Sequence, residues 1–165
     1  MADRRIVAYL VAAGVFVLDR LSKWIVETHV SFLDTYRVVP GFFDIVRSQN
    51  RGVAFGFLND SASPWSTGAL IAASLAAVAV VSAMIWKVGR LDTRSLWGLA
   101  LVLGGAAGNV FDRIVWGRVT DFLLVYLRDY QWPTFNLADS AIVAGSGLLI
   151  LDLLIGNRRR ASHVS

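Results

Sequence analysis

The chain has 165 residues, of which 56% are hydrophobic and 17% are charged, and its mean hydropathy is +0.57. A typical soluble domain is about 45–50% apolar and about 25% charged, so this composition indicates a membrane protein, and the length indicates one domain. There are no cysteines, which excludes disulfides, thiolate nucleophiles and cysteine-ligated metal sites. The sequence pI of about 10.0 would fit a nucleic-acid-binding protein, but the positions of the basic residues argue against that class.

Four segments are apolar and long enough to cross a bilayer core, which takes about 20 helical residues. They are residues 6–26, 68–86, 96–116 and 136–156. The first follows Arg4 and Arg5, as a cleaved signal peptide would, but it runs on through "LDRLSK" into further apolar residues, which favours a retained span. We therefore predict a mainly α-helical membrane protein with four transmembrane helices in a single integral domain, residues 1–165.

The basic residues between and beyond these spans predict their orientation. They gather before the first span, between the second and third, and after the fourth: Arg4, Arg5, Lys87, Arg90, Arg94, Arg158, Arg159 and Arg160. Cytoplasmic loops of membrane proteins carry an excess of Lys and Arg, so both termini are predicted to be cytoplasmic. The tail "NRRRASHVS" is then interpreted as a topological anchor and not as a nucleic-acid-binding segment.

The connections on the opposite side, 27–67 and 117–135, predict a small β-rich platform on the outer leaflet. Residues 37–57 are rich in Val, Phe and Ile with Gly and Pro breaks, and residues 119–135 are similar, with aromatic residues suited to the headgroup region. Within the platform, "NRGVAFGF" places the amide of Asn50 beside Gly52. A tight turn explains that pairing equally well.

Polar residues of three predicted spans converge at one depth. At about 1.5 Å per helical residue, Asp19 lies about 20 Å and Asp112 about 24 Å from the cytoplasmic ends of their spans. Asn136 and Asp139 begin the fourth span, and Asp121 lies in the outer loop just before it. A carboxylate within a membrane is costly and indicates function by default. The sequence therefore predicts a site near the outer leaflet.

Structural explanations compete with function at several of these positions. Asp19 and Lys23, four residues apart on one helix face, are typical of a local ion pair. Asp112 and the adjacent Arg113 could equally form an architectural ion pair. The other two aspartates, in the last outer loop and at the start of the fourth span, have no basic residue at helical spacing within their own segments, since Arg118, the nearest to Asp121, is in a loop; this favours function.

Small residues predict close packing of the third and fourth spans. "GGAAG" places Gly104 and Gly108 four residues apart, and Ala141 and Gly145 repeat that spacing. Such residues let transmembrane backbones approach closely. Ordinary helix packing explains them, and it would bring the outer ends of the two spans together.

Asp121 and Asp139 could together hydrolyse a peptide bond. Two carboxyl groups held close cannot both ionise easily, so one keeps a proton. The charged one can take a proton from water, and the protonated one can donate a hydrogen bond to a carbonyl. Other hydrolytic designs lack parts, because there is no Cys or His-Glu-x-x-His motif, and His29 and His163 are predicted on opposite sides of the membrane. Ser22 is adjacent to a lysine, and adjacent helical positions do not face each other.

Four sequence blocks follow one another along nearly the whole chain. They are "LDRLSK" (18–23), "NRGVAFGF" (50–57), "GGAAGNVFDRIVWGRVTDF" (104–122) and "FNLADSAI" (135–142). Together they resemble the lipoprotein signal peptidases, the signal peptidase II family of bacterial membrane aspartic proteases. Each block is moderately specific, and four in order between matching spans are highly specific. One departure is in the first block, where Gln and Thr are common in place of Arg20 and Ser22.

The resemblance implies an aspartic endopeptidase that removes the signal peptide from diacylglyceryl-modified bacterial prolipoproteins, cutting just before the lipidated cysteine. It implies that Asp121 and Asp139 are catalytic. It further implies substrate-binding or supporting roles for Asn50, Gly52, Asn109, Arg113 and Asn136, and structural roles for Asp19 and Lys23.

These expectations extend to location and partners. The chain is expected in the bacterial cytoplasmic (inner) membrane as a multi-pass monomer, with its active site at the outer leaflet. The expected partners are the lipidated prolipoprotein and membrane lipids, and no nucleic acid, cofactor or metal is expected.

Two other classes remain open. A metal-dependent lipid phosphotransferase could use Asp112, Asp121 and Asp139 to bind Mg²⁺, although its Asp-Gly-x-x-Ala-Arg pattern is absent. A small proton-coupled carrier could relay protons through the aspartates, although the inner halves of the spans carry few polar groups.

Overall fold

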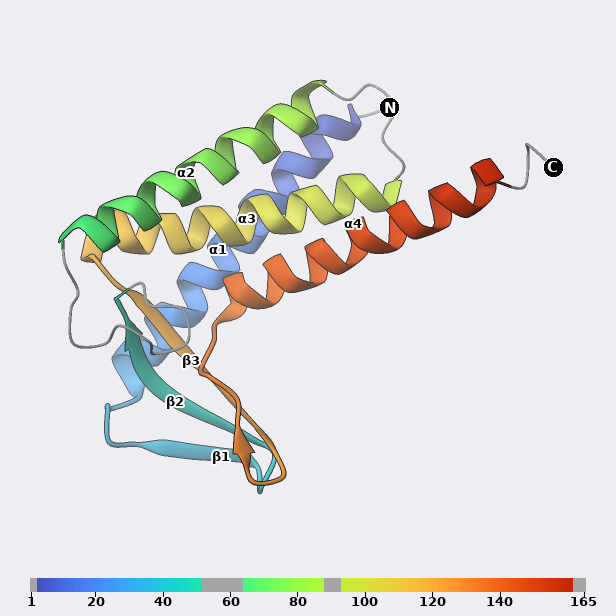
Figure 1. The fold of residues 1–165 in the computed structure, drawn as a ribbon. Coiled ribbons are helices and arrows are strands. Elements are labelled where there is room, and N and C mark those ends of the chain that lie inside the picture. The colour runs from blue at the N-terminus through green and yellow to red at the C-terminus, as the bar shows by residue number, and fades with distance from the viewer. Residues whose placement is uncertain (1–2, 52–63, 88–92, 162–165) are drawn as a thin grey trace.

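Four long helices and four strands make up the described part of the chain, residues 3–51, 64–87 and 93–161 of a computed structural model (Figure 1). In chain order they are α1 (Arg4–His29), β1 (Thr35–Val39), β2 (Phe43–Asn50), α2 (Pro64–Lys87), α3 (Thr93–Trp116), β3 (Val119–Leu127), β4 (Tyr130–Gln131) and α4 (Leu137–Ala161). The sheet lies at one end of the helices, and α1 begins and α4 ends at the other.

Local chemistry sets the ends of α1 and α3. Asp3 caps α1, because its carboxylate accepts the Arg5 N–H at 3.0 Å. α3 ends at Trp116, and the next residue, Gly117, has a φ of +65°, which suits glycine, and donates its N–H to the carbonyl oxygen of Arg113 at 3.1 Å. This turn leads directly into β3, so the chain passes from the end of α3 into the sheet within two residues.

α3 is the central helix of the bundle and packs against α1, α2 and α4. The main apolar core joins α1, α2 and α3 and consists of Ala8, Ala12, Ile85, Leu99, Ala100 and Leu103. The predicted contact between the third and fourth spans is confirmed, because a Cβ added to Gly145 would lie 2.6 Å from the carbonyl oxygen of Gly98. A Cβ on Gly105 would collide with the carbonyl oxygen of Ala138, so this glycine lets the start of α4 approach α3.

The four strands form one antiparallel sheet in the order β1-β2-β3-β4, which confirms the predicted β-rich segment. In the pairing of β2 with β3, Ser48 lies opposite Asp121 and Asn50 lies opposite Val119. A small apolar cluster fastens the sheet to α1 through Val26, Val30 and Phe122, with Ile45 and Leu123 packed against it. The part of the predicted platform that includes Gly52 lies outside the described residues.

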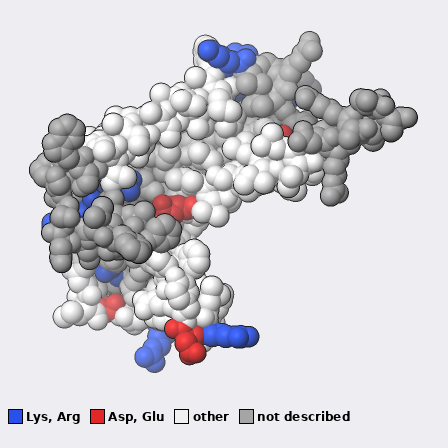
Figure 2. All heavy atoms as spheres, in the orientation of Figure 1, with Lys and Arg blue, Asp and Glu red and all other residues white. Residues whose placement is uncertain are grey.

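Three of the described helices are long and apolar enough to cross a membrane: residues 68–87, 93–116 and 137–155. Apolar side chains on these helices point outward, as Val80, Val143 and Leu153 do. α1 covers the other predicted span, 6–26, but is not among the three, because Asp19, Arg20 and Lys23 interrupt its apolar stretch with charged residues. Figure 2 shows that the described outer surface of the helices on this face is largely uncharged, apart from acidic atoms where the helices meet the sheet.

Candidate active site

The start of α4 holds Asp139 in a reciprocal cap with Asn136. The N–H of Asp139 donates to Asn136 Oδ1 at 2.9 Å, and the N–H of Asn136 donates to Asp139 Oδ2 at 3.2 Å. An oxygen-bearing cap residue and an acidic residue three positions later satisfy two helix-end N–H groups in this way. The position of the Asp139 carboxylate is therefore set by the first turn of its own helix.

Asp121 reaches the same place from the sheet. Asp121 is buried, with 3% of the residue exposed, and its Oδ1 accepts a hydrogen bond from Asn136 Nδ2 at 2.7 Å. The side chain of Asn50, on the neighbouring strand, also hydrogen-bonds this carboxylate. Asn136 thus contacts both aspartates, and we call Asp121 and Asp139 the carboxyl pair.

Asn109 of α3 bridges the carboxyl pair to the helix bundle. Its amide nitrogen donates to Asp139 Oδ1 at 2.7 Å, and its amide oxygen accepts from Lys23 Nζ at 3.1 Å and from Asn136 Nδ2 at 3.3 Å. An ammonium group can only donate, so Lys23 requires the amide oxygen on its side and directs the NH₂ group toward Asp139. The orientation of Asn109 follows from its neighbours.

Four charged side chains lie behind Asn109, and we call them the charge cluster: Asp19, Arg20, Lys23 and Asp112. Lys23 Nζ lies 2.7 Å from Asp19 Oδ2 and 2.7 Å from Asp112 Oδ2, and Arg20 Nη1 contacts Asp112 Oδ1. The predicted pair of Asp19 with Lys23 is confirmed. The suggested pair of Asp112 with Arg113 is wrong, because Asp112 turns toward α1 and is neutralised there by two cations.

Asp19 also joins α1 to α4. Its Oδ1 accepts the N–H of Ala138 at 2.9 Å, which satisfies a free donor in the first turn of α4. Gly108 of α3 makes room for this contact, because a Cβ there would lie 2.6 Å from Asp19 Oδ2. One carboxylate therefore fixes the height of α4, and with it Asp139, relative to α1.

Arg113 makes one hydrogen bond within the described part of the chain, from Nη1 to the carbonyl oxygen of Asn109 at 3.3 Å. Its Nε is buried without a hydrogen-bond partner there. Among the residues expected at the site, the structure brings together Asn50, Asn109, Asp121, Asn136 and Asp139 directly, with Asp19 and Lys23 behind them and Arg113 beside Asn109.

Burial and, next, the charge of Asp139 raise the pKa of the Asp121 carboxyl from 3.8 to about 6. Hydrogen bonds from Asn136 and Asn50, and the charge of Lys23, act in the opposite direction and are outweighed. The Asp121 carboxyl therefore keeps its proton to a higher pH than an ordinary aspartate does, and the neighbouring charge of Asp139 favours this neutral form.

This raised pKa predicts how Asp121 affects stability. Because the pKa is higher in the folded than in the unfolded chain, folding favours the neutral carboxyl. The contribution of Asp121 to the free energy of unfolding is therefore fully present below pH 4. It falls by up to about 3 kcal/mol as the pH rises through about 6. Asp121→Asn keeps an oxygen acceptor for Asn136 and cannot ionise. We expect the variant to melt at a higher temperature than the wild type in detergent at pH 7, with the difference vanishing at pH 4. Parallel melting curves across this pH range would contradict the assignment.

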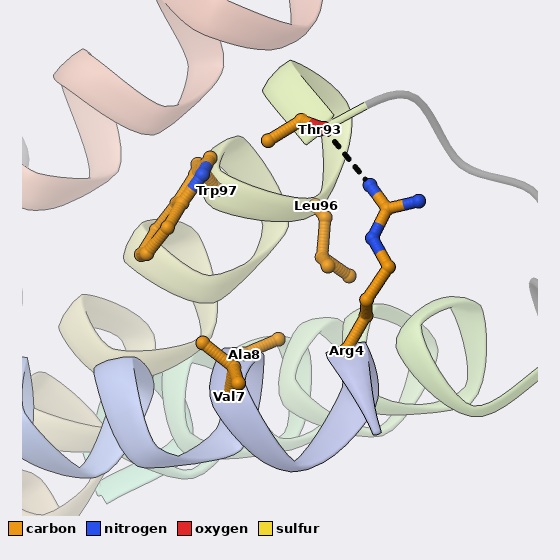
Figure 3. A pocket seen from close by; sticks show the side chains of 6 residues that line it. All are labelled: Arg4, Val7, Ala8, Thr93, Leu96 and Trp97. Atoms are coloured by element: carbon orange, nitrogen blue, oxygen red, sulfur yellow. Dashed lines mark hydrogen bonds between the residues drawn. The ribbon is translucent and has the colours of Figure 1, made fainter. Parts of the chain in front are cut away.

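The candidate active site lies at the sheet end of the helices, away from the one cavity described at the opposite end. Figure 2 shows acidic atoms at the surface where the helices meet the sheet, beside residues that are not described. A separate cavity of about 130 Å³ lies at the opposite end, between α1 and α3, lined by Arg4, Val7, Ala8, Thr93, Leu96 and Trp97 (Figure 3). There Arg4 donates to Thr93 Oγ1 at 3.0 Å, and the lining carries no carboxylate. This cavity is not part of the candidate active site.

Sequence reasoning missed two features of the site. It treated Arg20 only as a departure from the family pattern, whereas Arg20 binds Asp112 and stacks on two aromatic rings. It also missed Thr120, which donates to Glu27 Oε1 at 2.5 Å and ties the strand that carries Asp121 to α1. The predicted depths of Arg20 and Asp112 in their spans are similar, and this was the signal that could have paired them.

Comparisons with known proteins agree on one family. A family model described as signal peptidase (SPase) II matches residues 11–155. The chain is 62% identical over 165 residues to a lipoprotein signal peptidase of Solibacter usitatus, with all of both chains covered. It is 40% identical over 151 residues to one of Oleidesulfovibrio alaskensis, covering 92% of this chain and 96% of the relative. A bacterial membrane enzyme solved by the in meso method at 2.3 Å superposes with a TM-score of 0.81 and 27% identity, covering 92% of this chain and 89% of that one.

Proposed function

The chain belongs to the signal peptidase II family and cleaves the signal peptide of prolipoproteins, and we propose that it does so as an aspartic endopeptidase with Asp121 and Asp139 as its catalytic residues. The chain is an integral protein of the inner membrane. The observation that carries the proposal is that Asn136 contacts both carboxylates, donating from its side chain to Asp121 and exchanging hydrogen bonds with Asp139. Two acidic groups from different elements are thereby held at one point.

The geometry supports a direct attack by water. The ionised carboxylate takes a proton from water as its oxygen bonds to the scissile carbonyl carbon, while the protonated carboxyl donates to the carbonyl oxygen. The tetrahedral intermediate collapses when the C–N bond breaks: the carboxyl group that took the proton from water gives it to the departing nitrogen, and the other carboxylate takes back its proton as the carbonyl re-forms. Asn109 and Asn136 keep the two carboxylates in place during these transfers, because each amide has a second partner that fixes its orientation.

The substrate is proposed to be a prolipoprotein whose cysteine already carries a diacylglyceryl group, cut just before that cysteine. We assign supporting roles to Asn50, Gly52 and Arg113 in binding it, and structural roles to Asp19 and Lys23. The partly buried Asp139 and the Nε of Arg113, which has no hydrogen-bond partner among the described residues, fit a site that receives a polar backbone. The lipid and the signal helix would remain in the membrane beside the apolar outer surfaces of the helices.

A single experiment tests this activity. The purified protein is incubated with a lipidated prolipoprotein, and the products are identified by mass spectrometry. We expect one cut before the modified cysteine, unchanged by EDTA. Loss of activity in EDTA would instead favour the metal-dependent alternative, which needs Asp112 as a ligand although Arg20 and Lys23 already neutralise it.

We further propose that α1 is the fourth transmembrane helix of one domain, 1–165, with spans at about 6–26, 68–86, 96–116 and 136–156. In this arrangement both termini are cytoplasmic, and the sheet (27–67 and 117–135) and carboxyl pair lie at the outer leaflet. Lys87, Arg94 and the N-terminal arginines lie at the helix ends away from the sheet, which supports this orientation. We also propose that the chain acts as a monomer.

Thiol labelling checks this orientation without background, since the chain has no native cysteine. A membrane-impermeant maleimide added to intact cells should label Ser48→Cys or Thr134→Cys but not Thr93→Cys. Lipidated substrate should then shield position 48, which lies opposite Asp121 in the sheet. Labelling at position 93 would reverse the orientation, and unshielded labelling at position 48 would remove β2 from the site.

A further inference from the structure

Arg20 lies at the partly exposed edge of the charge cluster. Its guanidinium contacts Asp112 Oδ1, and its Cζ lies 4.3 Å from the ring centroid of Trp116 and 5.4 Å from that of Phe111. Phe16 packs edge-on against Phe111, with centroids 5.5 Å apart, and completes the aromatic wall. The Arg20 side chain is 17% exposed, so the cation is held by rings on one side and by a buried carboxylate on the other.

The charges of the cluster balance only when Arg20 is included. Asp19, Lys23 and Asp112 are buried, with at most 1% of each residue exposed, and their charges sum to −1. Arg20 brings the sum to zero. An uncompensated charge in such a site is costly, and its field reaches neighbouring groups with little screening.

A short chain of contacts joins this cluster to the carboxyl pair. Asp112 Oδ2 lies 2.7 Å from Lys23 Nζ, and Lys23 donates to Asn109 Oδ1 at 3.1 Å. Asn109 in turn donates to Asp139 at 2.7 Å. A change in the charge of the cluster therefore acts on Asp139 both through space and through the group that orients Asn109.

We propose that Arg20 is a positioning residue for the cleavage reaction, which balances the charge of the cluster and thereby sets the pH range over which the carboxyl pair holds a single proton. The inference rests on the proposed roles of Asp121 and Asp139. Arg20 does not touch the pair, and it acts through Asp112, Lys23 and Asn109.

The other described charged groups that face the pair are few. They are Asp19, Lys23 and Glu27 from α1, and Asp112 and Arg113 from α3, each of which contacts a residue of the site or a neighbour of one. β2 faces Asp121 with the neutral Ser48 and Asn50. A substitution at position 20 alters the ion pair of Asp112 but replaces none of these groups, so the net charge of the cluster can be varied at that one position.

The test measures cleavage of a lipidated prolipoprotein against pH for the full-length protein in detergent. One unit charge over about 10 Å, at an effective dielectric constant of about 20, is worth roughly one pH unit. Arg20→Gln leaves the cluster at −1, and we expect both limbs of the pH–rate profile to move to higher pH by about half to one unit. Asp112→Asn leaves it at +1 and should move them to lower pH. Arg20→Lys and the double variant Arg20→Gln/Asp112→Asn keep the sum at zero, and their profiles should coincide with that of the wild type.

Different results would contradict the positioning role of Arg20 and the catalytic role of the carboxyl pair. If Arg20→Gln lowers the rate or the melting temperature but leaves the profile in place, or if the double variant fails to restore it, Arg20 is structural only and the inference is wrong. If Arg20→Gln is too slow to profile, the ¹³C titration of the Asp121 carboxyl in the folded variant decides, with the same upward shift expected. If Asp121→Asn itself retains activity, the aspartic mechanism is wrong and this inference is wrong with it.

Discussion

Replacing Asp121 or Asp139 by Asn should reduce the cleavage rate by at least about 10³-fold while leaving the protein folded and inserted. The amide keeps the size of the carboxyl group and can still accept the hydrogen bonds of Asn136 and Asn109. It cannot take a proton from water, and it cannot share a proton with its partner. The measurement is the rate of prolipoprotein cleavage by each variant, with the melting temperature recorded in the same detergent.

Asp152→Asn is the matched control for this loss. Asp152 is also a carboxylate on α4, but it lies near the far end of the helix, where Ser95 Oγ donates to it. An amide oxygen can accept the same hydrogen bond, and the residue lies far from the carboxyl pair. We therefore expect the cleavage rate of Asp152→Asn to stay within about twofold of the wild type, because substitutions that break no buried contact usually have small effects. If Asp121→Asn or Asp139→Asn cleaves as fast as Asp152→Asn, the aspartic mechanism is refuted.

The helices and strands were largely predictable from local pattern. Apolar length alone located α2, α3 and α4, and Val- and Phe-rich segments with Gly and Pro breaks located the strands of the sheet. α1 shows the limit of that reasoning. Its last third turns Asp19 and Lys23 inward, where each is satisfied by tertiary partners, and composition cannot show whether such a helix spans the bilayer.

The site was predictable in depth but not in pairing. Helical rise places residues at a height along a span and says nothing of rotation about the axis, so Asp112 could be matched to its sequence neighbour Arg113 although it faces Arg20 and Lys23. The cap that joins Asn136 to Asp139 needed only local spacing. Contacts between α3 and α4, such as that of Asn109 with Asp139, depend on how closely the glycines let the helices approach.

Lys23→Met should lower the free energy of unfolding by about 3–5 kcal/mol, the largest stability loss expected of the single changes considered. Lys23 is fully buried and contacts Asp19, Asp112 and the Asn109 amide oxygen. Without the ammonium group, Asp19 is left charged in the core with only a backbone N–H, while Asp112 retains Arg20. The measurement is the shift in unfolding of the purified protein in detergent. Lys87→Met, at the exposed end of α2, is the matched control and should have little effect.

A second change on the same helix distinguishes loss of charge balance from loss of packing. Asp19→Asn removes the uncompensated charge but can still accept the Ala138 N–H, so the double variant Lys23→Met/Asp19→Asn should recover part of the stability. It should not recover cleavage, because Asn109 has lost the donor that directs its NH₂ group toward Asp139. Asp121→Asn is expected to behave in the opposite way at pH 7, with higher stability and no activity. If Lys23→Met proves no more destabilising than Lys87→Met, the charge cluster does not hold the helices together, and the orientation of the carboxyl pair must have another source.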